Sequence, residues 1–206
     1  TNLPPGLTFD PATKEIKGTP TQAGTYTIPV TVTDANGNTV TSNFTVKITD
    51  PLVLPAATLA NGTTGTVYPT QIIPLATGGS TPYTYSATGL PPGLTFDPAT
   101  REITGTPTQA GTFTVPVTIT DGDGKTVTTN YSITVVDPLV LPAATLADGT
   151  EGVLYPTQTI PAATGGSGSY TYTASNLPPG LTFDPATREI KGTPTQAGNY
   201  VVTVNV

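Results

Sequence analysis

The chain has 206 residues, of which 13 are acidic and 7 basic, so its formal charge is −6 at pH 7, and charged residues make up only 10% of it. Nucleic acids and anionic membranes attract clustered lysine and arginine, so this balance argues against both as partners. The chain has no cysteine and therefore no disulfide bonds, and no apolar run is long enough for a membrane-spanning helix, so we expect no membrane insertion.

The first recognisable element is the sequence LPPGLTFDPAT at residues 3–13, which returns unchanged at residues 90–100 and 177–187. The three copies begin at positions 3, 90 and 177, so they are 87 residues apart both times. A constant period of this length indicates one folded unit that has been copied in tandem. The question of function is therefore what a string of such units does.

The repeated stretch predicts a β-hairpin with a stiff entry. In the middle copy, the prolines favour extended backbone and Gly93 permits a sharp turn before a short strand at residues 94–96. Residues 97–100 have the composition of a type I turn, in which the Asp97 side chain bonds the backbone two residues on. The return strand covers residues 102–105. Leu94, Phe96 and Ile103 would then face a core.

We place the unit boundaries between Asp50 and Pro51 and between Asp137 and Pro138. Residues 51–137 are then one complete repeat, residues 1–50 the C-terminal part of a preceding one, and residues 138–206 the N-terminal part of a following one. A unit of this size suits a seven-stranded β-sandwich.

Within residues 51–137, strand signals recur every 8 to 12 residues or so, as in all-β sandwiches. Prolines at 51 and 55 confine the opening segment to an edge. The strands expected before the hairpin are an opening edge strand at residues 51–59, broken by its prolines, and strands at residues 70–74 and 83–87, with a turn at Asn61 and Gly62 and a loop at residues 77–82.

The two strands after the hairpin show the clearest alternation in the chain, separated by a turn at residues 121–124. Apart from Thr129, apolar side chains occupy every second position of both strands, and threonine fills most of the others, which is typical of half-buried strands. The predicted inward positions are Phe113, Val115, Val117, Ile119, Val127, Tyr131, Ile133 and Val135. Thr114 is predicted to face outward.

With these residues laid out, the chain resembles the immunoglobulin-like repeats that are related to the dystroglycan-type cadherin-like domains. The resemblance rests on LPPGLTFDPAT, on ITGTP at residues 103–107, on AGTFT at residues 110–114 and on VTITD at residues 117–121. It implies an all-β fold of tandem immunoglobulin-like, cadherin-like β-sandwiches in an elongated array. It also implies giant microbial surface proteins, adhesins and fibres, in which most copies are spacers.

An enzyme is disfavoured because the chain has neither histidine nor cysteine to act as base or nucleophile. Catalysis by paired carboxylates needs two acids that converge in a cleft. Asp97 and Glu102 flank one hairpin, but they recur in every copy at a turn and the adjacent strand. We therefore assign no catalytic and no cofactor-binding residue.

Calcium binding is a more serious alternative, because cadherin-like relatives bind calcium at domain junctions with oxygen ligands. Asp121 and Asp123 lie in one turn, and Asp137 is followed by Asp148 and Glu151. The first junction keeps only one of these last three carboxylates, and a site for six to eight oxygens is poorly provided. We therefore assign no metal ligand and expect no cofactor.

Paired tyrosines raise the alternative of carbohydrate binding. Tyr83 and Tyr85 share one strand face, and so do Tyr170 and Tyr172. The same spacing is typical of a strand that faces the core, and we favour that interpretation.

We therefore expect a non-catalytic structural repeat in the stalk or filament of a microbial cell-surface or extracellular protein. Its partners would be neighbouring repeats of the same chain and, in a filament, other copies. The alternative is a calcium- or glycan-binding adhesive module. Because no glycine interrupts the passage through Asp137 and Pro138, adjacent units are expected to hold a preferred angle.

The last unit ends at Val206, which corresponds to Ile119, so it lacks a counterpart of residues 120–137. Two explanations stay open. Either these residues belong to a longer continuous chain, or strands of neighbouring chains complete the end units. The overlap between residues 175–206 and 1–32 favours the longer chain.

Overall fold

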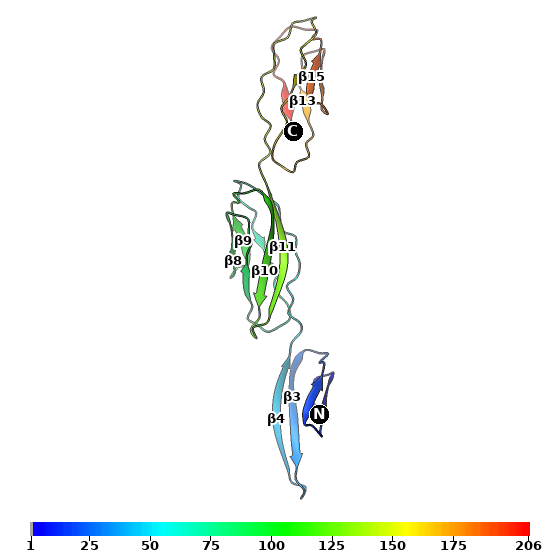
Figure 1. The fold of residues 1–206 in the computed structure, drawn as a ribbon, viewed down its shortest axis with the longest axis vertical. Helices are drawn as coiled ribbons and strands as arrows, with labels where there is room; N and C mark the ends of the chain where they lie inside the picture. The colour runs from blue at the N-terminus through cyan, green and yellow to red at the C-terminus, as the bar shows by residue number, and fades with distance from the viewer. Residues whose placement is uncertain (1) are drawn as a thin grey trace.

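The computed structural model describes residues 2–206 and contains only strands and loops over that range. Three bodies follow one another along the long axis of the molecule (Figure 1). We call them the first segment (residues 2–50), the middle segment (51–137) and the last segment (138–206). The predicted all-β class is confirmed.

The middle segment consists of two sheets that enclose one core. One sheet has four strands in the order β5-β11-β10-β7, and the other has three in the order β6-β9-β8. All pairs are antiparallel except β5 with β11. The bounds are β5 Gly62–Thr63, β6 Gln71–Ile72, β7 Thr84–Ala87, β8 Leu94–Asp97, β9 Glu102–Gly105, β10 Gly111–Thr120 and β11 Thr126–Val136.

The long hairpin β10–β11 follows the predicted alternation. Val115, Val117 and Ile119 of β10 are fully buried, whereas Thr114 is exposed. Successive side chains of a strand point to opposite faces, so the apolar set of both strands lies against the facing sheet. The predicted faces of these two strands are confirmed.

The core of the middle segment contains side chains from both sheets and from the irregular segments that precede β7. Each fully buried aliphatic side chain stabilises the fold by about 1.5 to 3 kcal/mol. The buried set is Leu54, Leu59, Tyr68, Ile73, Ala76, Tyr85, Leu94, Ile103, Val115, Val117, Ile119, Tyr131, Ile133 and Val135. Buried tyrosines need a hydrogen-bond partner, and the Tyr131 hydroxyl donates to the Pro55 carbonyl oxygen at 2.7 Å.

The opening part of the middle segment differs from the prediction. Residues 56–59 form no strand, and only Val53 makes an isolated bridge, to Thr77. The prolines on either side lack the N–H groups that a ladder needs. Leu59 is buried all the same, so this stretch contributes to the core as an irregular segment.

Gly62 was predicted to lie in a turn, and this prediction is wrong, because it begins strand β5. A Cβ atom there would lie 3.3 Å from the Tyr68 ring and 3.5 Å from Val135, so the absence of a side chain lets β5 pair closely with β11. The strand predicted at residues 70–74 shortens to β6, since Pro74 cannot donate to a ladder.

The repeated hairpin has the predicted pairing. Phe96 of β8 lies opposite Ile103 of β9, and the Asp97 carboxylate accepts a hydrogen bond from the Ala99 N–H at 2.8 Å. The same cap recurs at Asp10 and Asp184. The loop is one residue longer than predicted, because the Arg101 N–H donates to the Asp97 carbonyl oxygen with Arg101 in left-handed backbone.

The first segment contains two hairpins whose apolar face is open. Its strands are β1 Leu7–Asp10, β2 Glu15–Gly18, β3 Gly24–Thr33 and β4 Thr39–Ile48. Val32 is 62% exposed and Phe44 58%, whereas their counterparts Ile119 and Tyr131 are buried. A cavity of about 860 Å³ lies along this face. In the middle segment, residues 52–87 cover the same surface.

The last segment repeats the early part of the middle one. Its core is formed by Tyr155, Ile160 and Ile190, against which Leu181 and Phe183 pack. Residues 138–206 contain no counterpart of β11. The bounds are β12 Gln158–Thr159, β13 Thr173–Ser175, β14 Leu181–Asp184, β15 Glu189–Gly192 and β16 Thr203–Asn205.

Candidate site at the junctions between repeats

Each linker between segments is held by a glycine loop of the segment that follows it. At the first junction, the Gly79 N–H donates to the carbonyl oxygen of Asp50 at 2.8 Å. Gly78 has left-handed backbone, and a Cβ atom on it would lie 1.9 Å from the carbonyl oxygen of Pro51. Only glycine therefore allows this approach of two backbones.

The same arrangement recurs 87 residues later. The Gly166 N–H donates to the carbonyl oxygen of Asp137 at 2.7 Å, and a Cβ atom on Gly165 would lie 1.9 Å from the Pro138 carbonyl oxygen. We call residues 78–80 the first junction loop and residues 165–167 the second. The recurrence shows that this closure belongs to the repeat and is not peculiar to one linker.

Asp121, in the turn between β10 and β11, organises the first junction loop. One carboxylate oxygen accepts the Ser80 N–H at 3.1 Å, and the other accepts the N–H groups of Asp123 and Lys125 at 3.0 and 2.9 Å. Asp121 is 5% exposed. Its burial raises the pKa of this carboxyl, but the three N–H donors and the Lys125 ammonium lower it by more, so the pKa lies below its ordinary value.

One side-chain contact crosses the first junction. The Lys47 ammonium of β4 donates to the Ser80 hydroxyl at 3.1 Å. The Ser80 hydroxyl in turn donates to a carboxylate oxygen of Asp123 at 2.5 Å. Ser80 is 4% exposed, whereas Lys47 and Asp123 are exposed, so a buried hydroxyl links two charged groups at the surface.

The second junction has a different side-chain contact. The residue that corresponds to Lys47 is Thr134, whose hydroxyl lies 3.3 Å from that of Thr112 on the neighbouring strand, and Ser167 corresponds to Ser80 in the second junction loop. Instead, the Thr64 hydroxyl of the middle segment donates to the Asp137 carboxylate at 2.9 Å. That bond lies within one segment plus its linker, so it does not tie the last segment to the middle one.

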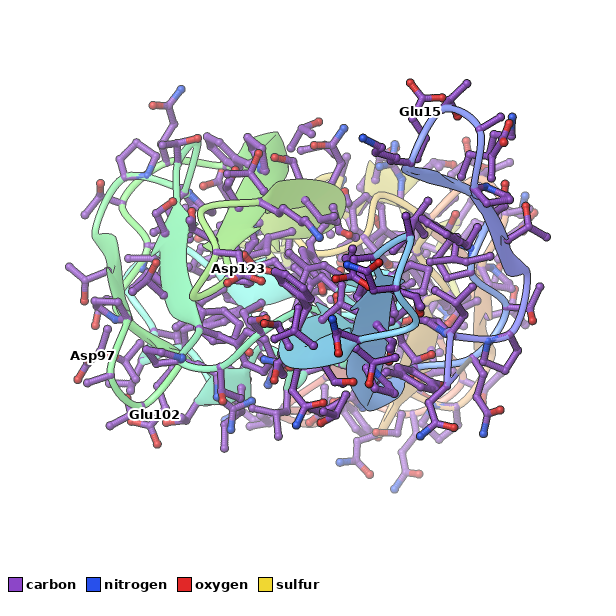
Figure 2. All side chains as sticks on the ribbon, turned by 90° about the horizontal axis from the view of Figure 1, so that it is seen from below. Glu15, Asp97, Glu102 and Asp123 are labelled. Atoms are coloured by element: carbon purple, nitrogen blue, oxygen red, sulfur yellow. The ribbon has the colours of Figure 1, made fainter. Side chains whose placement is uncertain are left out.

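The carboxylates that the sequence singled out are spread along the molecule. Asp97 and Glu102 are cross-strand neighbours and lie together at the outer edge of the middle segment, away from Asp123 (Figure 2). Glu151 accepts the Ala197 N–H at 3.1 Å, within the last segment. Among residues 2–206, no group of three or more histidine, cysteine or acidic side chains is placed to hold a metal ion.

The paired tyrosines point into the molecule. Tyr85 is buried and its hydroxyl oxygen accepts the Ala76 N–H at 2.8 Å, while the Tyr83 hydroxyl donates to the Gly78 carbonyl oxygen at 2.5 Å. Tyr172 and Tyr170 make the same contacts with Ala163 and Gly165. The rings are thus structural, and Tyr83 also supports the first junction loop.

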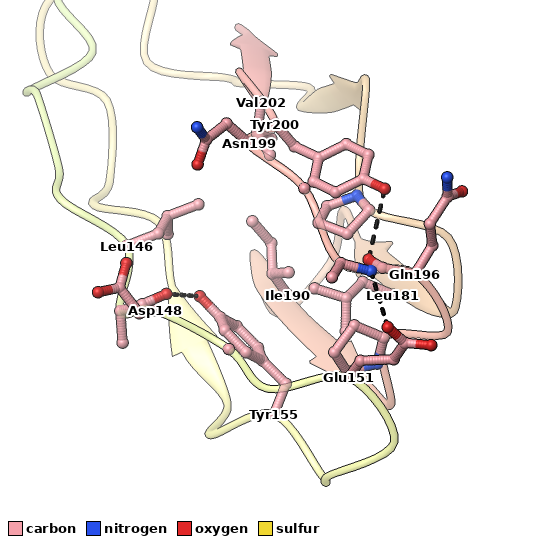
Figure 3. Close-up of a pocket in the computed structure, with 16 residues that line it drawn as sticks. Leu146, Asp148, Glu151, Tyr155, Leu181, Ile190, Gln196, Asn199, Tyr200 and Val202 are labelled. Atoms are coloured by element: carbon pink, nitrogen blue, oxygen red, sulfur yellow. Dashed lines mark hydrogen bonds between the residues drawn. The ribbon is translucent and has the colours of Figure 1, made fainter.

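A cavity of about 310 Å³ opens in the last segment, between Tyr155, Ile190 and Tyr200 (Figure 3). The Tyr155 hydroxyl donates to the Ala147 carbonyl oxygen across its edge. In the middle segment, the corresponding core residues Tyr68 and Ile103 pack in one cluster with β11. The cavity therefore corresponds to the place of a core strand, and it has no converging set of polar groups.

Sequence reasoning missed the residues that form the junction. It treated residues 77–82 as a loop without a role and did not single out Lys47. The available signal was the recurrence of Thr-Gly-Gly-Ser at residues 164–167, because two adjacent glycines that return with the period indicate a backbone requirement. Across residues 2–206, no helix is long and apolar enough to cross a membrane.

Comparison with known proteins places this geometry in a family. The chain is similar to the "Serine-rich adhesin for platelets" of Staphylococcus aureus strain MRSA252, with 39% identity over 134 residues, which cover 64% of this chain and 10% of the adhesin. For the same adhesin of strain USA300, the identity is 39% and the match covers 6% of its length. The chain thus spans a tenth or less of these relatives.

Two solved structures are similar over nearly the whole chain. The human Desmocollin-1 ectodomain has a TM-score of 0.49 at 14% identity, with 97% of this chain and 47% of that chain covered. The immunoglobulin domains 1–5 of Sidekick-1 have a TM-score of 0.48 at 15% identity, with 98% and 50% covered.

The family described as "Putative Ig domain" matches the chain in three consecutive segments, residues 1–49, 50–136 and 137–206. The expected resemblance to immunoglobulin-like repeats is confirmed, and so is the fold of tandem immunoglobulin-like β-sandwiches. Since the three matches together span the chain, it belongs to this family of immunoglobulin-like domains.

Proposed function

We propose that the chain is a non-catalytic spacer in the stalk or filament of an extracellular or cell-surface adhesin or fibre. The observation that carries the proposal is the end-to-end arrangement of three immunoglobulin-like segments, each linker being bound by the glycine loop of the next segment (Figure 1). A stalk needs units that add length and hold their direction. The adhesin relatives support an extracellular location.

Under this proposal, residues 51–137 are the complete unit and the boundaries lie before Pro51 and Pro138. The long strand β10 has 10 residues. At about 3.3 Å per residue, with end loops added, each unit should contribute roughly 35 to 45 Å to the length. Small-angle scattering of the chain should give an extended particle with this increment per unit, and freely jointed beads would contradict the proposal.

The alternative is an adhesive module that binds calcium or a glycan; the name of the relatives speaks for adhesion but names neither ligand. Against it, the Asp121 and Glu151 carboxylates already accept hydrogen bonds from the chain, and the paired tyrosines are packed inside. Isothermal titration with calcium and a glycan array should therefore both be blank. Saturable binding at micromolar concentrations of either would refute the spacer function.

A further inference from the structure

Two hydrogen bonds at the first junction share the Ser80 hydroxyl, one from Lys47 and one to Asp123, and we call this chain of bonds the relay. The middle segment sets which group donates in each. The Ser80 hydroxyl has one proton and donates it to Asp123, so its oxygen is left as an acceptor that faces the preceding segment. The Lys47 ammonium, which can only donate, approaches that oxygen to 3.1 Å. Donor and acceptor therefore match across the junction.

The charges around the relay favour a cation at this point. Asp121 and Asp123 lie in the turn that faces the junction, and Lys47 is the cation that the last strand of the preceding segment brings to it. Lys125 lies in the same turn, where its N–H and its charge act on Asp121. Ion pairs within 4 Å among residues 2–206 are Lys17 with Asp10 and Lys191 with Glu189. Lys47 therefore reaches the Asp123 carboxylate through the serine hydroxyl.

The chain includes its own comparison. The second junction has the same backbone closure, from the Gly166 N–H to the Asp137 carbonyl oxygen, but Thr134 stands in the place of Lys47, and residues 138–206 include no counterpart of the turn with Asp123. A threonine side chain is too short to span the distance that a lysine does. The two junctions thus share the backbone hydrogen bond, but the side-chain hydrogen bond from Lys47 to Ser80 is found at the first junction.

We propose that Lys47, Ser80 and Asp123 form a latch that restrains bending between the first and the middle segment. The inference rests on the proposed spacer function and deepens it. The chain then has one latched junction and one held by its backbone closure. Hydrogen bonds with a charged partner are stronger than neutral ones, and the buried Ser80 hydroxyl makes one with Lys47 and one with Asp123, so the three residues can restrain motion between the segments.

The absence of cysteine makes the test direct, because introduced cysteines are the only labelling sites. Gln22, Gln109 and Gln196 are exposed, correspond to one another and lie one in each segment. Spin labels on Q22C with Q109C report the first junction, and labels on Q109C with Q196C report the second. Pulsed dipolar spectroscopy then measures the width of each distance distribution.

We expect the distribution across the first junction to be narrower than that across the second. Lys47→Thr, which installs the residue found at position 134, should broaden the first distribution and leave the second unchanged. Ser80→Ala should broaden it to the same extent, and the double variant should be no broader than either single one. Lys17→Thr is the matched control, since the Lys17 ion pair lies within the first segment, and it should change neither width.

A first width that is unchanged in Lys47→Thr or in Ser80→Ala would overturn the latch. Broadening of the first distribution by a calcium chelator would overturn it as well, because a bound metal would then hold the junction. These results are distinct from a failure of the spacer function. Binding in the calcium titration or on the glycan array would refute that function while the difference in widths persisted.

Discussion

The isoleucine at position 103 recurs at positions 16 and 190, so one residue type can be compared at two buried positions and one exposed position. Ile103 lies in the central strand of the β6-β9-β8 sheet and is fully buried, whereas its counterpart Ile16 is 45% exposed and Ile190 is 1% exposed. Replacing a buried isoleucine by alanine removes its transfer free energy and leaves a cavity, which together cost about 2 to 5 kcal/mol. We expect about 3 to 4 kcal/mol for Ile103→Ala, and about 1 kcal/mol for Ile16→Ala, whose open site leaves no enclosed cavity.

Hydrogen exchange read by mass spectrometry suits this comparison, because a chain of several units does not unfold in one two-state transition. Peptides from residues 51–137 should exchange about 100- to 1,000-fold faster in Ile103→Ala, since about 1.4 kcal/mol corresponds to a factor of ten. Ile190→Ala should produce an effect of that size in the last segment. Small and equal changes for Ile103→Ala and Ile16→Ala would refute the assignment of burial.

Other substitutions and conditions test the remaining parts of the structure. Phe96 is only partly buried, so Phe96→Ala should cost about 2 kcal/mol in thermal unfolding of its unit, and the exposed Thr114→Ala less than about 0.5 kcal/mol; the reverse order would show that the faces are misassigned. Gly79→Ala should loosen the first junction, because its Cβ atom would lie 2.6 Å from an Asp121 oxygen. Gly124→Ala, whose Cβ atom would meet nothing within 4 Å, should cost only about 1 kcal/mol of backbone strain. Similar rates of hydrogen exchange near the junction in both variants would contradict the contact at Gly79. The folded-state pKa of Asp121 lies below the ordinary value of 3.8, so its stabilising contribution is present above that pH and is lost as the pH falls below it through the folded pKa; acid titration of Asp121→Asn should show a smaller loss of stability in that window than the parent chain, and an identical acid transition would argue against the role of this carboxylate.

The sequence by itself determined the features that depend on local periodicity. Alternation with a period of two assigned the buried faces of β10 and β11, because neighbouring side chains of a strand point to opposite sides wherever the strand lies. The Asp97 cap was predictable for the same kind of reason, since the bond reaches only two residues along the chain. The 87-residue recurrence indicated a tandem array without any knowledge of the fold.

Tertiary structure decided the features that depend on contacts between distant residues. Gly62 resembles a turn residue in the sequence, yet it pairs in parallel with Val135, which lies far along the chain. Residues 51–59 were predicted as an edge strand, but only Val53 pairs, in an isolated bridge with Thr77. Strand pairing depends on which partner the fold brings alongside, and a local pattern does not contain that information.

The first junction also depends on contacts that the local sequence pattern does not contain. Lys47 occupies an outward position of β4, where lysine and threonine are equally compatible with the pattern, and the chain uses both at positions 47 and 134. Its contact with Ser80 exists only because the linker and the first junction loop bring the end of one segment against the loops of the next. The 87-residue recurrence identifies the units. The way one unit meets the next depends on the left-handed backbone of Gly78 and Gly79, and this backbone conformation is known only from the folded structure.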